Sequence, residues 1–147
     1  MALLKWIPYK ELLFLQERMR RVFEETIAKY MGIEVPSGAA WSPPADIYET
    51  QSKVILKVEL PGIDIEDVEI EVKDSFLVVK GDKRQRVTTN EYYHRMECSY
   101  GAFQRIFSLP VVIDRTQIQA TLSDGVLTIV VPKIEKEKLI HVKVEAK

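Results

Sequence analysis

The sequence predicts an all-β fold, an immunoglobulin-like antiparallel β-sandwich with a helical N-terminal arm and an extended C-terminal tail. Between residues 53 and 131, short apolar runs recur at roughly ten-residue spacing with turn residues between them, as in antiparallel sandwiches. Residues 10–31 instead carry a helical period, and a proline-rich stretch separates the two patterns. We therefore expect an arm over residues 1–41, a sandwich domain over 42–133 and an extension over 134–147.

The helix of the arm is expected over residues 10–31, where apolar side chains recur at three- and four-residue steps with charged side chains between them. Gly32 is expected to end the helix. One full turn, Leu12-Leu13-Phe14-Leu15, is apolar on every side, which is more than a helix lying on a domain needs. We interpret this surplus as a face kept for partners.

Residues 33–44 are expected to form a linker, because prolines lock φ and remove backbone donors. Beyond them, apolar and polar residues alternate with the period of strands that bury one face. Pro61-Gly62 ends the first strand, and Asp124-Gly125 is a turn between the last two. The expected strands are 53–60, 68–72, 75–80, 96–109, 118–122 and 126–131.

The segment between Gly81 and Met96 is polar and too long for a hairpin turn. Its end, Tyr92-Tyr93-His94-Arg95, has the aromatic and alternating character of a short strand. A strand on a long arm can pair with a sheet edge of another subunit, which would protect that edge and build a homodimer.

The C-terminal extension repeats a strand pattern over Ile140-His141-Val142-Lys143-Val144, after a charged stretch. Such a peptide can add itself to a sheet edge and place Ile140 and Val142 in two pockets. The register stays open, because Val142 and Val144 have the same spacing. In the alternative interpretation, the segment is the last strand of its own domain.

Composition excludes several classes of function. The chain has 21 basic and 22 acidic residues, a formal charge of -1, so we expect no nucleic acid partner. Cys98 is the only cysteine, which excludes an internal disulfide framework and fits a reducing compartment. Lys5 and Pro8 interrupt the N-terminal apolar runs, and no segment approaches the roughly 20 apolar residues of a membrane span. We expect a cytoplasmic protein with no membrane contact.

The titratable residues predict no enzyme, no cofactor and no metal. His94 and His141 lie far apart and have no Cys, Asp or Glu spacing that would build a metal site. The acidic residues between Asp64 and Asp74 lack the spacing of a calcium loop and are expected to form a solvated face. There is no Gly-rich phosphate loop, no Gly-x-Ser-x-Gly elbow and no catalytic triad.

Several short motifs follow one another in the order and approximate spacing of a known family. They are Pro44-Ala45-Asp46-Ile47-Tyr48-Glu49, Leu60-Pro61-Gly62, Tyr93-His94-Arg95, Phe103-x-Arg105-x-Phe107-x-Leu109-Pro110 and Gly125-Val126-Leu127-Thr128. With these motifs the chain resembles the small heat shock protein (Hsp20) family over residues 42–133, whose sandwich is the α-crystallin domain. The helix over residues 14–25 is similar to the N-terminal arms of bacterial members. Cys98 departs from the pattern, because bacterial relatives often carry an arginine at this position. We expect Cys98 to be a small residue that is packed or half-exposed; the alternative is a redox-sensitive thiol.

The resemblance implies assembly through surfaces outside the core. A homodimer would form by swapping the loop strand, with an interface at Tyr92, Tyr93, His94, Arg95 and Arg105. Arg105 shares a strand face with Phe103 and Phe107 and needs a partner there; the alternative is a solvated surface arginine. Ile140 and Val142 match the family's Ile-x-Ile/Val anchor, which joins dimers into a larger homo-oligomer. By position, its docking groove would be formed by Val68, Ile70, Val72, Ile118, Ala120 and Leu122.

The resemblance also implies a holdase, a chaperone that binds unfolding client proteins without ATP and passes them to ATP-driven chaperones. Client binding would use the apolar face of the arm, at Leu12, Leu13, Phe14, Leu15, Val22 and Phe23. The alternative is another β-sandwich binding module, such as a carbohydrate-binding sandwich or a co-chaperone of the p23 type. The first needs exposed aromatics on a sheet face, whereas Trp6 and Trp41 lie outside the core; the second usually lacks the arm and the Ile-x-Val tail.

Overall fold

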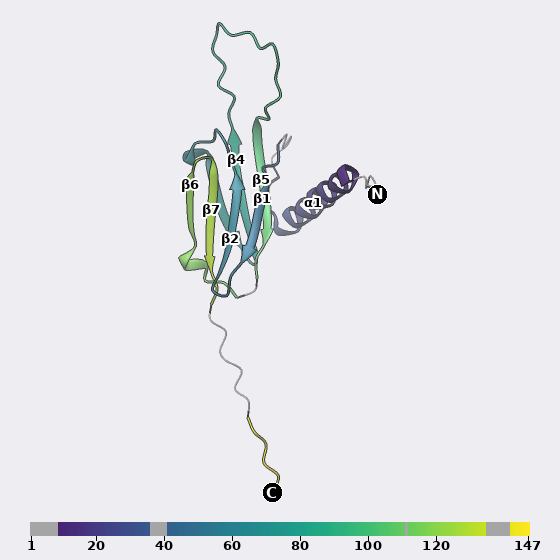
Figure 1. Cartoon of the computed structure of the whole chain (residues 1–147), viewed down its shortest axis with the longest axis vertical. Coiled ribbons are helices and arrows are strands. Elements are labelled where there is room, and N and C mark those ends of the chain that lie inside the picture. The colour runs from purple at the N-terminus through teal and green to yellow at the C-terminus, as the bar shows by residue number, and fades with distance from the viewer. Residues whose placement is uncertain (1–8, 36–40, 111, 135–141) are drawn as a thin grey trace, which may run out of the picture.

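The computed structural model describes residues 9–35, 41–110, 112–134 and 142–147, and its strands all lie between residues 45 and 132. One helix precedes them (Figure 1). In chain order the elements are α1 (Tyr9–Met31), β1 (Ala45–Glu49), β2 (Lys53–Glu59), the short 3-10 turn η1 (Ile65–Asp67), β3 (Val68–Lys73), β4 (Phe76–Lys83), β5 (Gly101–Ser108), the 3-10 turn η2 (Arg115–Gln117), β6 (Gln119–Ser123) and β7 (Val126–Pro132).

The seven strands form two antiparallel sheets, which confirms the predicted sandwich. One sheet has the order β1-β2-β7-β6, and the other has the order β3-β4-β5. Each sheet therefore has two edge strands, β1 and β6 in the first and β3 and β5 in the second.

The core lies between the sheets and follows the alternation expected from the sequence. Val54, Leu56 and Val58 of β2 are buried and stand opposite Val131, Ile129 and Leu127 of β7. Leu77 and Val79 of β4 and Phe103 and Phe107 of β5 face them from the second sheet and belong to the same apolar cluster. Burial of these side chains is the main favourable term in folding the sandwich.

Four details differ from the strands predicted by sequence, the first being that β4 runs on to Lys83 rather than ending at residue 80. β1 lies over residues that were named only as a motif, and β5 begins at Gly101 rather than at residue 96. Residues 92–95 form no strand in this single chain. They lie on the long loop that projects beyond the ends of β4 and β5 (Figure 1), where no neighbouring strand pairs with them. A strand needs such a neighbour to satisfy its backbone groups.

The helix α1 contacts the sandwich near its C-terminal end. Ala28 is buried with Val78 and Ile106 in a second, smaller apolar cluster, and Ile33 packs against it. The helix ends at the predicted place, where the Ile33 N–H donates to the Ala28 carbonyl at 2.8 Å. The part of α1 nearer its N-terminus extends away from the sandwich (Figure 1).

The Asp124-Gly125 turn connects β6 to β7 in the way the sequence predicts. Ser123 pairs with Val126, and the two residues between them have φ values of 53° and 74°, as a type I′ turn requires. The Gly125 carbonyl accepts a hydrogen bond of 2.7 Å from the Leu60 N–H. This hydrogen bond joins the turn to the segment Leu60-Pro61-Gly62, which leads from β2 to η1.

Gly81 in β4 has no room for a side chain. A Cβ there would lie 2.3 Å from the Asp67 carbonyl oxygen and 2.8 Å from Phe103 Cζ. We expect Gly81→Ala to lower the free energy of unfolding by about 2 kcal/mol, because backbone or a buried ring must move. Urea unfolding at a fixed protein concentration measures the change. Asp82→Ala, at the exposed neighbouring position, is the control and should change it by less than about 0.5 kcal/mol; equal effects would contradict the packing argument.

Candidate functional site

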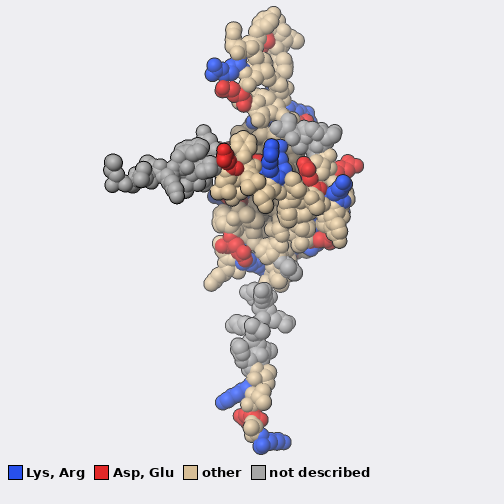
Figure 2. All heavy atoms as spheres, turned by 90° about the vertical axis from the view of Figure 1, so that its right-hand side faces the viewer, with Lys and Arg blue, Asp and Glu red and all other residues tan. Residues whose placement is uncertain are grey.

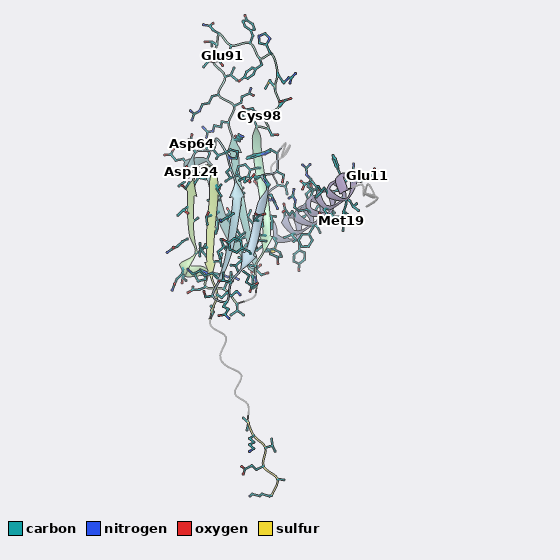
Figure 3. The ribbon with its side chains drawn as sticks, viewed as in Figure 1. Glu11, Met19, Asp64, Glu91, Cys98 and Asp124 are labelled. Carbon is teal, nitrogen blue, oxygen red and sulfur yellow. The ribbon has the colours of Figure 1, made fainter. Side chains whose placement is uncertain are left out.

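The first candidate surface is the apolar face of α1. The six predicted partner-contacting residues are all exposed, and Phe14 is the most exposed at 73%. Met19 and Tyr30 extend this face at 64% and 91% exposure, although the prediction left them out. Met19 could have been included, because it stands four residues after Leu15 on the same helical stripe. Figure 3 shows Glu11 and Met19 on the part of α1 that lies away from the sandwich.

The C-terminal half of α1 is held to the sandwich by a buried ion pair. Arg105 Nε of β5 donates to Glu24 Oε1 at 3.2 Å, and Arg105 Nη1 donates to the Pro43 carbonyl at 2.6 Å. Arg20 adds a second ion pair to Glu24 at 3.0 Å and donates to the Ser42 hydroxyl at 2.6 Å. Burial lowers the pKa of the Arg105 guanidinium, and the carboxylate of Glu24 opposes that shift.

Arg105 is therefore not a solvated surface residue, since both it and Glu24 are only 8% exposed. Its neighbours Phe103 and Phe107 are buried on the same side of the strand, as the alternation predicts. The acid that compensates Arg105 in this structure is on the same chain. Sequence reasoning missed Glu24, because one more acid on the charged side of a helix gives no sign of its partner. The role of Arg105 in a dimer interface stays a prediction.

The edge strands β1 and β5 lie on the same side of the sandwich. Trp41, just before β1, packs edge-on against Phe103 of β5 with ring centroids 5.2 Å apart. The bond from Arg105 to Pro43 spans the same gap. Because each sheet has only two edges, β3 and β6 must form the opposite side.

The six predicted groove residues lie on these two strands or directly beside them. Val68, Ile70 and Val72 of β3 are half-buried and pack against the core, while the residues between them are exposed. Ile118 and Leu122 do the same on the β6 side. Ala120 pairs with the buried Ile129 on the core-facing side and is nevertheless exposed. The core-facing side of β6 is therefore open to solvent at Ala120.

The predicted anchor is only partly described by the structure. Ile140 and His141 lie outside the described residues. Val142 and Val144 are 80% and 90% exposed, and residues 142–147 are in neither helix nor strand. Docking of the tail and its register stay predictions.

The long loop between β4 and β5 is a third candidate surface, after the apolar face of α1 and the edge between β3 and β6. Tyr92, Tyr93, His94 and Arg95 are all exposed on it, with Tyr92 at 91%. Cys98 is also exposed, not packed or half-exposed as the sequence indicated. On the edge strand β1, Ile47 and Tyr48 are about half exposed at 48% and 47%.

The surface of the described residues carries charged side chains of both signs. On the face shown in Figure 2, acidic and basic side chains are interspersed. Among the described residues, no three His, Cys, Asp or Glu side chains are grouped so that they could hold a metal ion. Within the same residues, no helix is both long and apolar enough to cross a membrane.

Comparison with known proteins gives one consistent result. The model of the Hsp20/alpha crystallin family matches residues 46–145. The small heat shock protein C2 of Rickettsia felis is 40% identical over 104 residues, which are 70% of this chain and 68% of that protein. A 17.8 kDa class I heat shock protein of Arabidopsis thaliana is 32% identical over 135 residues, 90% of this chain and 76% of that protein.

Solved structures agree with these sequence matches. Heat shock protein 16.0 from Schizosaccharomyces pombe superposes with a TM-score of 0.63 at 31% identity, covering 73% of this chain and 99% of that one. A small heat-shock protein from Xylella fastidiosa, described as having a distinct high order structure, gives a TM-score of 0.62 at 34% identity and covers 72% and 98%.

The ion pair between Glu24 and Arg105 yields a test of how α1 is held. Glu24→Ala leaves a buried guanidinium without its carboxylate. We therefore expect the free energy of local opening of the docked end of α1 to fall by about 2 kcal/mol. Hydrogen exchange of the amides around Ala28 measures this opening. Glu25→Ala, at the exposed adjacent position, is the control. Equal loss of protection in both variants would show that the pair does not hold the helix.

Proposed function

The chain belongs to the Hsp20/alpha crystallin family, whose members are non-enzymatic chaperones, and from that membership we propose that it is an ATP-independent holdase. It would bind proteins that are unfolding and prevent their aggregation. The observation that carries the proposal is the apolar face of α1, exposed on an arm beside a charged sandwich. An apolar patch of this kind is a binding surface in a soluble protein or a cause of aggregation.

The proposed client contact works through the hydrophobic effect. Unfolding proteins expose core residues, and leucine, methionine and phenylalanine side chains on a helix can cover them without a fixed shape. Specificity would be low, because a surface that repacks accepts many partners. The charged sandwich would keep the complex dispersed. The proposed contact consumes no ATP and only holds the client. Refolding would therefore be carried out by ATP-driven chaperones to which the client is passed.

The proposed dimer joins the long loop of one copy to β1 of another. An unpaired edge strand presents free N–H and C=O groups that a second strand can satisfy. β1 is such an edge, and its Ile47 and Tyr48 are available to the tyrosines of an incoming segment. Residues 92–95 would gain there the partner strand that they lack in the single chain.

The proposed larger assembly uses the tail of residues 134–147, outside the sandwich domain of residues 42–133. Ile140 and Val142 would dock at the edge between β3 and β6, where the core-facing Ala120 is exposed. We place the assembly in the cytoplasm, because a single cysteine is the usage typical of a reducing compartment.

The holdase proposal predicts that the purified chain suppresses aggregation without nucleotide. A client such as citrate synthase is heated with it at near-stoichiometric ratio, and light scattering is followed. Phe14→Gln with Val22→Gln removes two exposed apolar side chains and keeps good helix formers, so several-fold more protein should be needed.

The matched control is Arg18→Gln with Glu25→Gln, two exposed polar positions on the same helix. This variant should suppress scattering like the unmodified protein. If the unmodified chain fails to protect several unrelated clients, the holdase proposal is wrong. If the two double variants behave alike, the apolar face of α1 is not the client surface.

The tail proposal predicts a smaller oligomer that keeps a folded dimer. Ile140→Ala with Val142→Ala removes two branched side chains, each of which contributes on the order of 1.5–3 kcal/mol when buried. Native mass spectrometry measures the size of the assembly. The single variants Ile140→Ala and Val144→Ala distinguish the registers, because only the docked residue should matter. An unchanged size in the double variant would contradict docking.

A further inference from the structure

Lys83, the last residue of β4, lies between two aromatic rings. Its Nζ is 5.1 Å from the ring centroid of Trp41 and 5.5 Å from that of Tyr100. The three side chains are half-buried, and Trp41 packs against the fully buried Phe103. A lysine within about 6 Å of an aromatic face is attracted by the negative charge density of the ring.

These contacts join three segments that are distant in sequence. Lys83 is where the chain leaves the sandwich for the long loop, and it pairs with Gly101, where the chain returns. Tyr100 is the last residue of the returning segment, and Gly101 has a φ of 112°, in the region that favours glycine. Trp41 comes from the segment that leads from α1 to β1. Lys83 therefore touches both roots of the loop and the end of the linker.

Two ion pairs also lie at the root of the loop. Arg84 pairs with Asp67 at 2.8 Å and Arg86 with Asp64 at 3.1 Å, and both arginines are strongly exposed. Exposed ion pairs of this kind contribute little and are screened by salt. Both of them also hold only the outgoing segment. Beside the backbone pairing of Lys83 with Gly101, the side-chain contact of Lys83 with Tyr100 links the outgoing segment to the returning one.

We propose that Lys83 is a positioning residue that clamps both roots of the loop to Trp41 and so fixes the direction in which residues 92–95 are presented to a second copy of the chain. This inference rests on the swapped dimer proposed above. Backbone pairing of β4 with β5 ends at Lys83 and Gly101, so without a side-chain contact the loop beyond this pair would sample many directions, and that freedom would be lost on pairing with a partner. Because the clamp restricts the loop before pairing, less conformational entropy is lost when the dimer forms.

Cys98 supplies the readout, because it is the only cysteine and is exposed. Figure 3 shows it near the base of the loop. A spin label on Cys98 reports the mobility of the returning segment, and sedimentation at decreasing concentration reports dissociation of the dimer. The variants are Lys83→Met, which keeps the apolar stem, and Lys83→Arg, which keeps the cation. Lys80→Met is the matched control on the same strand, where the lysine pairs with Glu69 and Glu71.

Lys83→Met should make the label more mobile and raise the dissociation constant about tenfold, as expected for losing two such contacts. Lys83→Arg and Lys80→Met should match the unmodified protein in both measurements. Unchanged label mobility in Lys83→Met overturns the clamp, and increased mobility with an unchanged dissociation constant overturns its positioning role. If the unmodified chain never dimerises, the swapped dimer is wrong, and the label alone decides whether Lys83 holds the loop.

Discussion

Two stacked sheets leave four edge strands, each with one side that has no hydrogen-bonded neighbour. The helix, the long loop and the tail are best understood by which of these edges they cover or could cover. β1 and β5 lie on one side of the sandwich, β3 and β6 on the other. Unpaired edges attract further strands and must be covered if uncontrolled aggregation is to be avoided. In this chain α1 lies against β5 through Glu24 and Arg105, whereas β1 and the edge between β3 and β6 stay open within the described residues.

Arg105 links the core to the arm. It stands on the core-facing side of an edge strand, between two buried phenylalanines, and its charge is compensated by a helix that begins far away in sequence. A buried pair of this kind contributes little net stability but strongly penalises loss of either partner. It therefore specifies where the arm sits. The outer face of α1 stays free for the client contact proposed above.

The sequence was sufficient for features that depend on local periodicity. The helix, its end at Gly32, the alternation of β2 and β3 and the Asp124-Gly125 turn all follow from neighbouring residues. β1 escaped prediction because a short strand after two prolines has too few residues to show a period. Glu24 and Lys83 escaped for another reason: each acts through partners distant in sequence, and nothing around them marks those partners. The absence of a strand at residues 92–95 has the same origin, because pairing depends on a second strand.

The central claim is that the open edges of the sandwich are covered by segments of other copies. Backbone hydrogen exchange, followed by mass spectrometry at high and at limiting protein concentration, tests it most directly. The account predicts that amides of β1, β3 and β6 exchange slowly in the assembled protein and become faster on dilution, while those of β2 and β7 change little. Equal exchange of the edge strands at both concentrations would contradict the account.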